Sequence, residues 1–353
     1  MFLKILLIAG LLVGAKFIHA SLTRKTASNE APIDEFWWNG LTEEWKTIFL
    51  INQTLQQNGV DIYKIQNDYL NRLNKGDDPG LSEINTALYD LEAAKEFGLS
   101  YSDFYARVSR TMKLVKSDTI DLNKLAQLET LYIVNSPSDL SPLRKFTQLK
   151  TLILNFGGRP YGSSLSEHSL DLEPIRNLTS LRALHCVSCP IKSLDPVSNL
   201  INLEELCISN TSVASLASLH KLVHLKRLSF GSSVKSISPL KHLILLEELY
   251  VRGCKDLSGL SGMKGLKKLS IAENELAVVN DAYRIKDLSF LKDLKLLQFL
   301  DVENTSYIGS LSMVSNLSDL RAVTLPRVSS MDAAEFKKSR PGCVIINAYE
   351  FER

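Results

Sequence analysis

Hydrophobic residues recur at a fixed spacing through most of this chain, and the stretch from Leu203 to Leu222 shows the spacing most regularly. Counting Leu203 as position 1, apolar residues occupy positions 1, 4, 6, 11, 14, 17 and 20, and a small polar residue, Thr211, occupies position 9. A short strand followed by a threefold-spaced run cannot bury its apolar side alone, so it needs a similar unit on either side. The pattern therefore predicts a solenoid of stacked repeats.

Nine units of this kind follow one another. Most begin 20 to 23 residues after the preceding one, but the steps after Leu149 and Leu266 are 32 and 31 residues. The units begin at Leu128, Leu149, Leu181, Leu203, Leu225, Leu246, Leu266, Leu297 and Leu320. Positions 4 to 6 predict one strand core in each unit, at Leu131–Ile133, Leu152–Leu154, Leu184–Cys186, Leu206–Ile208, Leu228–Phe230, Leu249–Val251, Leu269–Ile271, Leu300–Val302 and Val323–Leu325.

The residues before the repeats follow a helical pattern. Thr42 can cap a helix whose apolar face carries Trp45, Ile48, Phe49 and Leu55. A second helix is expected from Leu81, after the break at residues 76–80. A solenoid exposes its core at each end, so we interpret this helical region as an N-terminal cap and its tryptophans as cap packing, with a ligand-binding aromatic cluster as the alternative.

Both ends of the chain carry further signals. An uncharged apolar run, Ile5–Ala15, is too short to span a bilayer comfortably and suits the core of a signal peptide. The alternatives are an uncleaved anchor over residues 2–20 or neither. At the other end, Met331–Ser339 is helical by pattern and Cys343–Ile346 predicts a short strand, together a C-terminal cap. The predicted domains are 1–20 signal peptide or anchor, 21–32 linker, 33–108 helical cap, 109–328 repeats and 329–353 C-terminal cap.

At this point the sequence resembles a known family. The unit length and the segments Asp139–Leu143, Leu194–Val197 and Ile237–Leu240 are similar to the internalin-like subclass of bacterial leucine-rich repeat proteins, over roughly residues 109–350. The resemblance implies a curved parallel β-sheet of the α/β class, with 3-10 or irregular structure on the convex side, that serves as a scaffold for protein–protein contact. No immunoglobulin-like module or cell-wall sorting signal follows the repeats in the sequence, so host-cell invasion is not implied.

The repeat register gives the cysteines a structural interpretation. Cys186 and Cys189 look like a redox or metal pair, but they occupy positions 6 and 9, which are expected inside the coil. A buried free cysteine behaves as a small hydrophobic residue. No second CxxC completes a zinc set, so we expect no metal site. Cys207 differs because position 5 lies on the concave face, but no basic residue adjoins it in its strand, so we expect it to be inert.

Charges follow the same register. Positions 2 and 3 read Glu204-Glu205, Lys226-Arg227, Glu247-Glu248 and Lys267-Lys268 in successive units, which predicts a cross-strand ladder of ion pairs. A ladder that pairs with itself argues against a nucleic-acid groove, as does the net charge of +2. The basic run at residues 264–268 is interpreted as a solvated rim. No nucleophile, phosphate-loop or HExxH motif occurs, so we expect neither catalytic residues nor a cofactor.

Two surfaces are candidates for binding a protein or peptide. The first consists of the two insertions, 156–169 and 276–286, which each place an arginine near a tyrosine and are expected on one rim; neutral loop drift is the alternative. The second is the concave face at position 5, together with Arg252. The candidate residues are Arg159, Tyr161, Tyr283 and Arg284 in the insertions, and Tyr132, His185, Tyr250, Arg252 and Asp301 on the sheet.

Function and location are predicted from the same observations. We expect a non-catalytic binding protein that is exported to the periplasm, the cell surface or the medium. It would contact membrane only through an uncleaved N-terminal segment. The alternative is an intracellular scaffold that binds and controls a partner enzyme.

Overall fold

A single ten-stranded parallel sheet organises the molecule, with its strands in chain order from β1 to β10. The computed structural model describes residues 33–57, 120–134, 137–155, 169–231, 233–272, 288–302, 314, 316–324 and 330–346. The strands are β1 Thr130–Val134, β2 Thr151–Asn155, β3 Ala183–Val187, β4 Glu205–Ile208, β5 Arg227–Phe230, β6 Glu248–Arg252, β7 Lys268–Ala272, β8 Phe299–Asp301, β9 Ala322–Thr324 and β10 Val344–Ile346. Seven of the nine predicted strand cores lie wholly within these strands; β8 ends at Asp301, one residue before the predicted Val302, and Leu325 of the last core lies outside the described residues.

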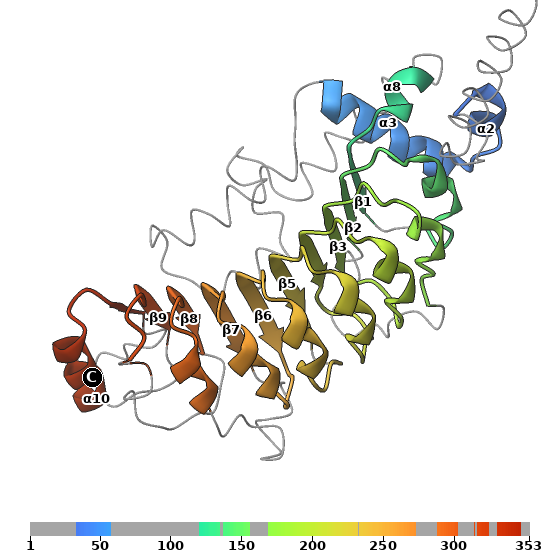
Figure 1. Cartoon of the computed structure of the whole chain (residues 1–353). Helices are drawn as coiled ribbons and strands as arrows, with labels where there is room; N and C mark the ends of the chain where they lie inside the picture. The colour runs from blue at the N-terminus through green and yellow to red at the C-terminus, as the bar shows by residue number, and fades with distance from the viewer. Residues whose placement is uncertain are drawn as a thin grey trace, which may run out of the picture.

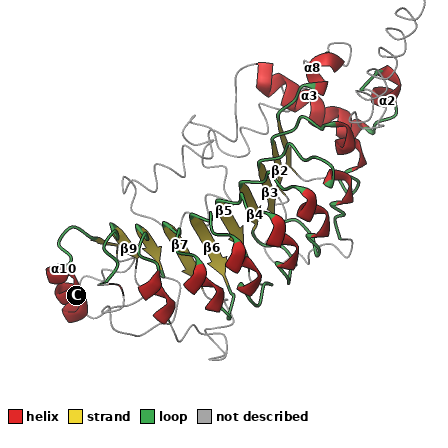
Figure 2. Ribbon diagram, in the orientation of Figure 1, coloured by secondary structure: helices red, strands yellow, loops and turns green. Residues whose placement is uncertain are grey.

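Short 3-10 helices connect the strands and form the outer side of an arc whose inner, concave side is the sheet (Figures 1 and 2). Four of them carry proline in their first turn, where the fixed φ of proline suits the helix and no backbone N–H is lost from the ladder. The helices are η2 Ser141–Lys145, η3 Glu173–Ile175, η4 Asp195–Asn199, η5 Ala217–Lys221, η6 Ser238–His242, η7 Ser258–Gly262 and η10 Ser289–Asp293.

Each coil contributes one layer to a continuous core. The residues at position 4 pair in register across all nine repeat strands, and each is at most 1% exposed: Leu131, Leu152, Leu184, Leu206, Leu228, Leu249, Leu269, Leu300 and Val323. Because every coil buries its apolar residues against two neighbours, the stack is stabilised by nearest-neighbour contacts. The predicted fold class, a curved parallel-sheet solenoid with a 3-10 convex side and terminal caps, is confirmed.

In three of the turns that follow a strand, the residue at position 8 has a left-handed backbone conformation. Ser188, Asn210 and Gly253 all stand at position 8 and adopt positive φ angles of 54°, 54° and 70°. This left-handed conformation favours asparagine and glycine, and it turns the chain toward the convex side. Position 9 side chains bond backbone carbonyls at the same turns. The Ser233 hydroxyl donates to the Thr211 carbonyl of the preceding coil at 3.0 Å, whereas the Thr211 hydroxyl donates to the Ile208 carbonyl of its own coil.

Two helices, α2 (Glu35–Asn39) and α3 (Glu43–Gln57), cover the N-terminal end of the sheet beside α8 (Leu122–Ala126). Thr42 caps α3 as predicted, since its Oγ1 accepts a hydrogen bond from the Trp45 N–H. The buried Asn52 side chain bonds both backbone groups of Tyr132 on β1, accepting from its N–H at 2.7 Å and donating to its carbonyl at 2.9 Å. The helix thereby satisfies the edge strand as another strand would.

Aromatic rings fill the space between α3 and the first repeat. The Phe49 ring stacks on Trp45 and on Phe146, with ring centroids 5.1 Å and 4.9 Å apart. The Trp45 indole N–H also donates to the Asp139 carbonyl at 3.0 Å. Trp38 and Trp45 are buried and Trp37 packs against the same cluster. The interpretation of the tryptophans as cap packing is therefore confirmed.

The C-terminal cap has the predicted form, with helix α10 (Ser330–Ser339) and strand β10, which pairs with β9. Phe336 from the helix and Cys343 before the strand are both buried against the last repeat. Several predicted segments lie outside the described residues: the apolar N-terminal run, the linker, the expected helix from Leu81 and both insertions. Only Ser169, the last residue of the first insertion, is described. The domain boundaries therefore remain predictions.

Candidate functional site

The position 5 side chains form one row across the concave face of the sheet. Strand pairing connects them in register from β1 to β9: Tyr132, Ile153, His185, Cys207, Ser229, Tyr250, Ser270, Asp301 and Thr324. The row therefore brings Tyr132, His185, Tyr250 and Asp301 onto one surface, as the repeat register predicts. Arg252 stands two residues beyond Tyr250 on the same strand face.

Most of this row is more buried than an open face implies. Tyr132, His185 and Asp301 are only 5%, 3% and 4% exposed, whereas Tyr250 and Arg252 are half-buried. Neighbours in the row stand about 4.8 Å apart, so each shields the next. Long side chains at position 3, such as Glu205 and Arg227, flank the row as well. The part of the row with exposed surface is therefore centred on β6.

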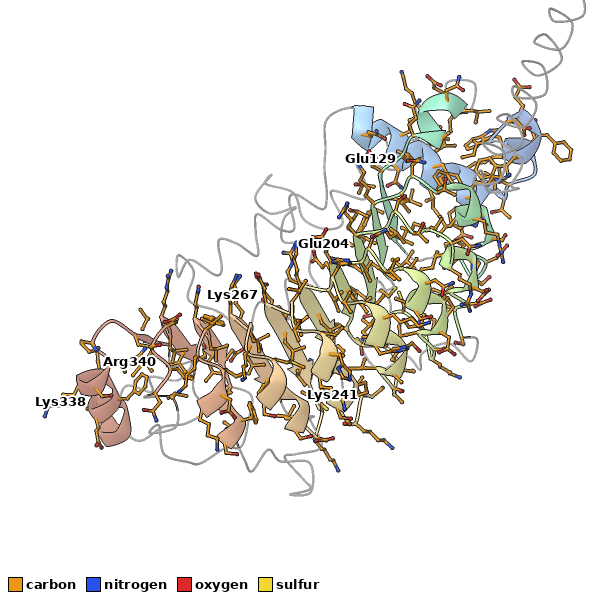
Figure 3. The ribbon with its side chains drawn as sticks, in the orientation of Figure 1. Glu129, Glu204, Lys241, Lys267, Lys338 and Arg340 are labelled. Carbon is orange, nitrogen blue, oxygen red and sulfur yellow. The ribbon has the colours of Figure 1, made fainter. Side chains whose placement is uncertain are left out.

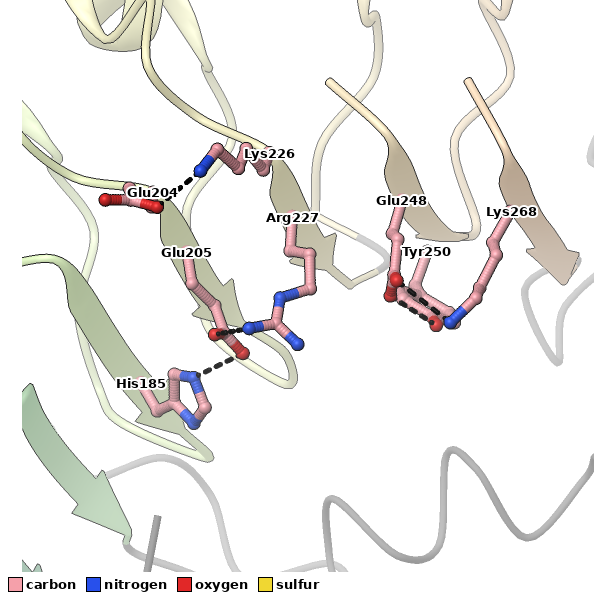
Figure 4. A network of polar contacts seen from close by, with 8 residues as sticks. All are labelled: His185, Glu204, Glu205, Lys226, Arg227, Glu248, Tyr250 and Lys268. Atoms are coloured by element: carbon pink, nitrogen blue, oxygen red, sulfur yellow. Dashed lines mark hydrogen bonds and ion pairs between the residues drawn. The ribbon is translucent and has the colours of Figure 1, made fainter. Parts of the chain in front are cut away.

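A buried carboxylate, Glu205, links three strands in the middle of the face (Figure 4). Its Oε1 lies 3.1 Å from His185 Nε2 on β3, and its Oε2 lies 2.7 Å from an Arg227 guanidinium nitrogen on β5. Burying a charge is unfavourable unless it is paired and hydrogen-bonded. The two partners satisfy this requirement, so His185 has a structural contact in the network.

Tyr250 is the best-placed of the predicted binding residues. Its hydroxyl donates to Glu248 Oε2 at 3.3 Å, and Glu248 also pairs with Lys268 at 2.9 Å (Figure 4). Burial raises the pKa of the Tyr250 phenol well above its ordinary value, and the Glu248 carboxylate adds to the effect. The hydroxyl therefore stays protonated at physiological pH and acts as a hydrogen-bond donor.

Asp301 occupies the polar end of the row. Its carboxylate accepts a hydrogen bond from the Ser270 hydroxyl at 2.8 Å. Ser229 and Ser209 make a comparable contact, 2.8 Å between their hydroxyl oxygens. The row thus changes from aromatic and aliphatic residues over β1 to β3 toward hydroxyl and carboxylate groups over β5 to β9.

The predicted charge ladder is present along the edge of this face. Each acidic pair bonds to the basic pair of the following coil, at 2.7 Å for both Glu204–Lys226 and Glu205–Arg227 and at 2.9 Å for both Glu247–Lys267 and Glu248–Lys268. Bonds from Lys226, and secondly from Arg182, lower the pKa of Glu204. Figure 3 shows Glu204 and Lys267 on the sheet side of the arc. The ladder neutralises itself, as expected.

All five cysteines are free and buried. Cys186 and Cys189 lie inside their coil as the register predicts, and Cys207 is only 3% exposed although it stands in the concave row. Burial raises the pKa of the Cys189, Cys207 and Cys254 thiols, and that of Cys254 reaches about 12. A thiolate is the nucleophilic form, so these thiols are poor nucleophiles.

We therefore expect slow reaction of the native thiols with Ellman's reagent at pH 8 and rapid reaction of all five after denaturation. The free energy of unfolding is expected to fall as pH rises from 9.0 toward about 12, because the Cys254 thiol then ionises in the unfolded chain and stays protonated in the folded one. Equal reaction rates for native and denatured protein would contradict this interpretation.

In the described part of the chain, no group of three or more histidine, cysteine, aspartate or glutamate side chains could hold a metal ion. The four predicted insertion residues lie outside the described residues, so their placement on one rim stays a prediction: Arg159, Tyr161, Tyr283 and Arg284.

Within the described ranges, no helix is both long and apolar enough to cross a bilayer.

Comparison with known proteins concerns the fold. No protein-family model and no curated protein matches this sequence. Solved structures similar to the chain include an internalin, InlF, from Listeria monocytogenes (18% identity, TM-score 0.42, covering 67% of this chain and 80% of that one). A leucine-rich repeat protein from Leptospira interrogans is also similar (23% identity, TM-score 0.49, 63% and 55%). The functional domain of InlJ from Listeria monocytogenes is a third (22% identity, TM-score 0.41, 60% and 48%).

These identities are below 25%, so the likeness concerns the fold alone. The repeat register and the ten-stranded topology define the fold as a leucine-rich repeat solenoid.

Proposed function

We propose that this protein is a non-catalytic scaffold that binds a protein or peptide through the concave face of its sheet. The observation that carries the proposal is the row of position 5 side chains across nine strands, whose accessible part is Tyr250 with Arg252 beside it. Tyrosine and arginine are enriched where binding energy concentrates, because each combines apolar area with directed hydrogen bonds. The insertion residues Arg159, Tyr161, Tyr283 and Arg284 are included as a second part of the surface.

The chemistry of the face favours a scaffold over an enzyme. The ladder glutamates are paired with lysine or arginine, Asp301 accepts a hydrogen bond from Ser270, the thiols are buried, and the Tyr250 phenol is held protonated. None of these described groups is an available nucleophile or general base at neutral pH. The repeat family is used widely as a protein-binding scaffold, which agrees with this interpretation.

The proposed location is outside the cytoplasm, with the N-terminal apolar run acting as a signal peptide or as an anchor. The support is the sequence pattern of residues 1–20. Mass spectrometry of the mature protein tests this: a chain that begins near Ser21 is expected, and an intact Met1 in the cytosolic fraction would favour the intracellular scaffold instead.

The double variant Tyr250→Ala/Arg252→Ala tests the binding face. Partners captured by cross-linking to the wild-type chain in its native cells are expected to bind the variant at least about tenfold more weakly, as for a truncated hot spot. The matched control is Lys192→Ala, an exposed side chain away from the sheet row. Circular dichroism verifies that each variant is folded. Wild-type affinity of the folded double variant would overturn the assignment.

A further inference from the structure

Exposed hydrophobic side chains occur at one repeated place on the solenoid. Ile201, Val223 and Ile244 each stand two residues before position 1 in three successive coils, in the turn between a 3-10 helix and the next strand. They are 51%, 46% and 69% exposed. Leu245 and Leu296, one residue before position 1, are 48% and 47% exposed. We call these five residues the apolar ridge.

The turns that carry the ridge stack directly on one another, and the turn with Lys264 and Gly265 separates Leu296 from the other four residues. The Asn202 side chain donates to the Thr179 carbonyl of the preceding coil at 2.9 Å. A Cβ atom added to Gly265 would lie 3.1 Å from the Ile244 carbonyl, so these two turns are in contact as well. Adjacent coils are about 4.8 Å apart at the sheet, so side chains at equal positions form a line. Each of these side chains therefore presents a large solvent-exposed apolar area.

Lysines surround the ridge. Lys221, Lys241, Lys264, Lys292 and Lys295 lie on the same helices and turns, and all five are exposed. Lys295 donates a hydrogen bond to the Asn316 carbonyl, and none of the five forms an ion pair with another described residue. They differ in this respect from Lys226, Lys267 and Lys268, which the charge ladder neutralises. Figure 3 shows Lys241 on the side of the 3-10 helices, away from the sheet.

The 3-10 helices and turns of these coils carry a net positive charge, as does the equivalent stretch 141–148 of an earlier coil, with Arg144 and Lys145. Residues 217–224, 238–245, 258–265 and 289–296 together contain five lysines and one aspartate, Asp293, a net charge of +4 with histidine neutral. The equivalent stretch of the preceding coil, residues 195–202, contains one aspartate and no basic residue.

We propose that the apolar ridge and its lysines dock the solenoid on an anionic lipid bilayer. Projecting aliphatic side chains can enter the interfacial region, while lysine stems extend along apolar surface and keep their ammonium groups among lipid phosphates and carboxylates. Each lysine near an anionic leaflet contributes attraction that salt screens. A peptide partner would instead need a groove to receive its apolar side chains. The proposal is independent of the binding face, since the ridge lies on the turns and helices and the face lies on the sheet.

Vesicle cosedimentation of the full chain tests the proposal. Wild type is expected to bind phosphatidylcholine vesicles with 30 mol% phosphatidylserine at least about tenfold more strongly than pure phosphatidylcholine vesicles, and less strongly at 0.5 M salt. Lys221→Glu/Lys241→Glu is expected to remove that difference. Val223→Ser/Ile244→Ser is expected to weaken binding about fivefold or more, since it removes apolar area that enters the bilayer.

The control variant is Lys192→Glu/Lys235→Glu, which makes the same charge change at two exposed lysines off the ridge. Every variant keeps the N-terminal apolar run, so binding through that run affects all of them equally. Equal binding by wild type, ridge variants and control would overturn the proposal. A concentration-dependent dimer of wild type that the Val223→Ser/Ile244→Ser variant abolishes, without vesicle binding, would identify a second copy of the chain as the occupant and also overturn it.

Discussion

Replacement of Phe49 by alanine is expected to lower the free energy of unfolding by about 3–5 kcal/mol. Phe49 is fully buried and stacks between Trp45 and Phe146, with Trp37 at a centroid distance of 5.6 Å. Its removal takes away the contact through which helix α3 covers the first coil. Because a solenoid depends on its caps, loss of this contact exposes the end of the core. Chemical denaturation followed by tryptophan fluorescence measures the change, since three tryptophans lie in the cap.

Phe36→Ala is the matched control, because it makes the same substitution on helix α2 at a side chain that is 90% exposed. It is expected to change the free energy of unfolding by less than about 0.5 kcal/mol. Equal costs for the two variants would mean that the aromatic cluster does not hold the cap on the repeats.

The second large effect is expected for Glu205→Gln, which should lower the free energy of unfolding by about 2–3 kcal/mol. The glutamine keeps the shape of the side chain and loses the charge that pairs with Arg227 on one strand and contacts His185 on the other. Removing one partner of a buried pair leaves the other incompletely compensated. Urea denaturation at pH 7 measures the difference.

Glu204→Gln is the control beside it. Glu204 bonds Lys226 and Arg182, but its side chain is 32% exposed, against 10% for Glu205, and water screens its pairs. An exposed pair contributes about 0–1 kcal/mol, so the control is expected to cost clearly less. If the two variants are equally stable, the contacts of Glu205 with His185 and Arg227 contribute no more to the free energy of unfolding than a surface ion pair does.

The two glutamates also show where sequence reasoning reaches its limit. They are adjacent, and in the sequence they read as one acidic pair of the charge ladder. Glu205 begins strand β4 and shares the concave face with Cys207, whereas Glu204 precedes the strand and is more exposed. The pairing of both was predictable from the register. Glu205 has the larger expected effect on the free energy of unfolding because it is buried, and its burial depends on side chains of the neighbouring strands β3 and β5.

The apolar ridge is a second such case. Ile201, Val223 and Ile244 adjoin core leucines, so hydropathy alone does not separate them from the core. Their shared offset from position 1 in three units is a signal that the sequence does contain. The basic run at residues 264–268, interpreted as one solvated rim, divides in the structure: Lys267 and Lys268 pair with glutamates, and Lys264 belongs to the ridge surface.

The sequence by itself determined the repeat register, and with it the strands, the inward cysteines and the charge ladder. This was possible because each unit repeats one local pattern and contacts only its neighbours. The caps were also predictable, from helical periodicity and from the core that a solenoid exposes. Only the tertiary structure decided how much of the concave row is exposed and that Asn52 hydrogen-bonds the backbone of the edge strand β1. It also decided that aliphatic side chains from separate turns form one ridge, beside lysines that have no ion-pair partner among the described residues. Those properties depend on distances between different coils, which no single repeat encodes.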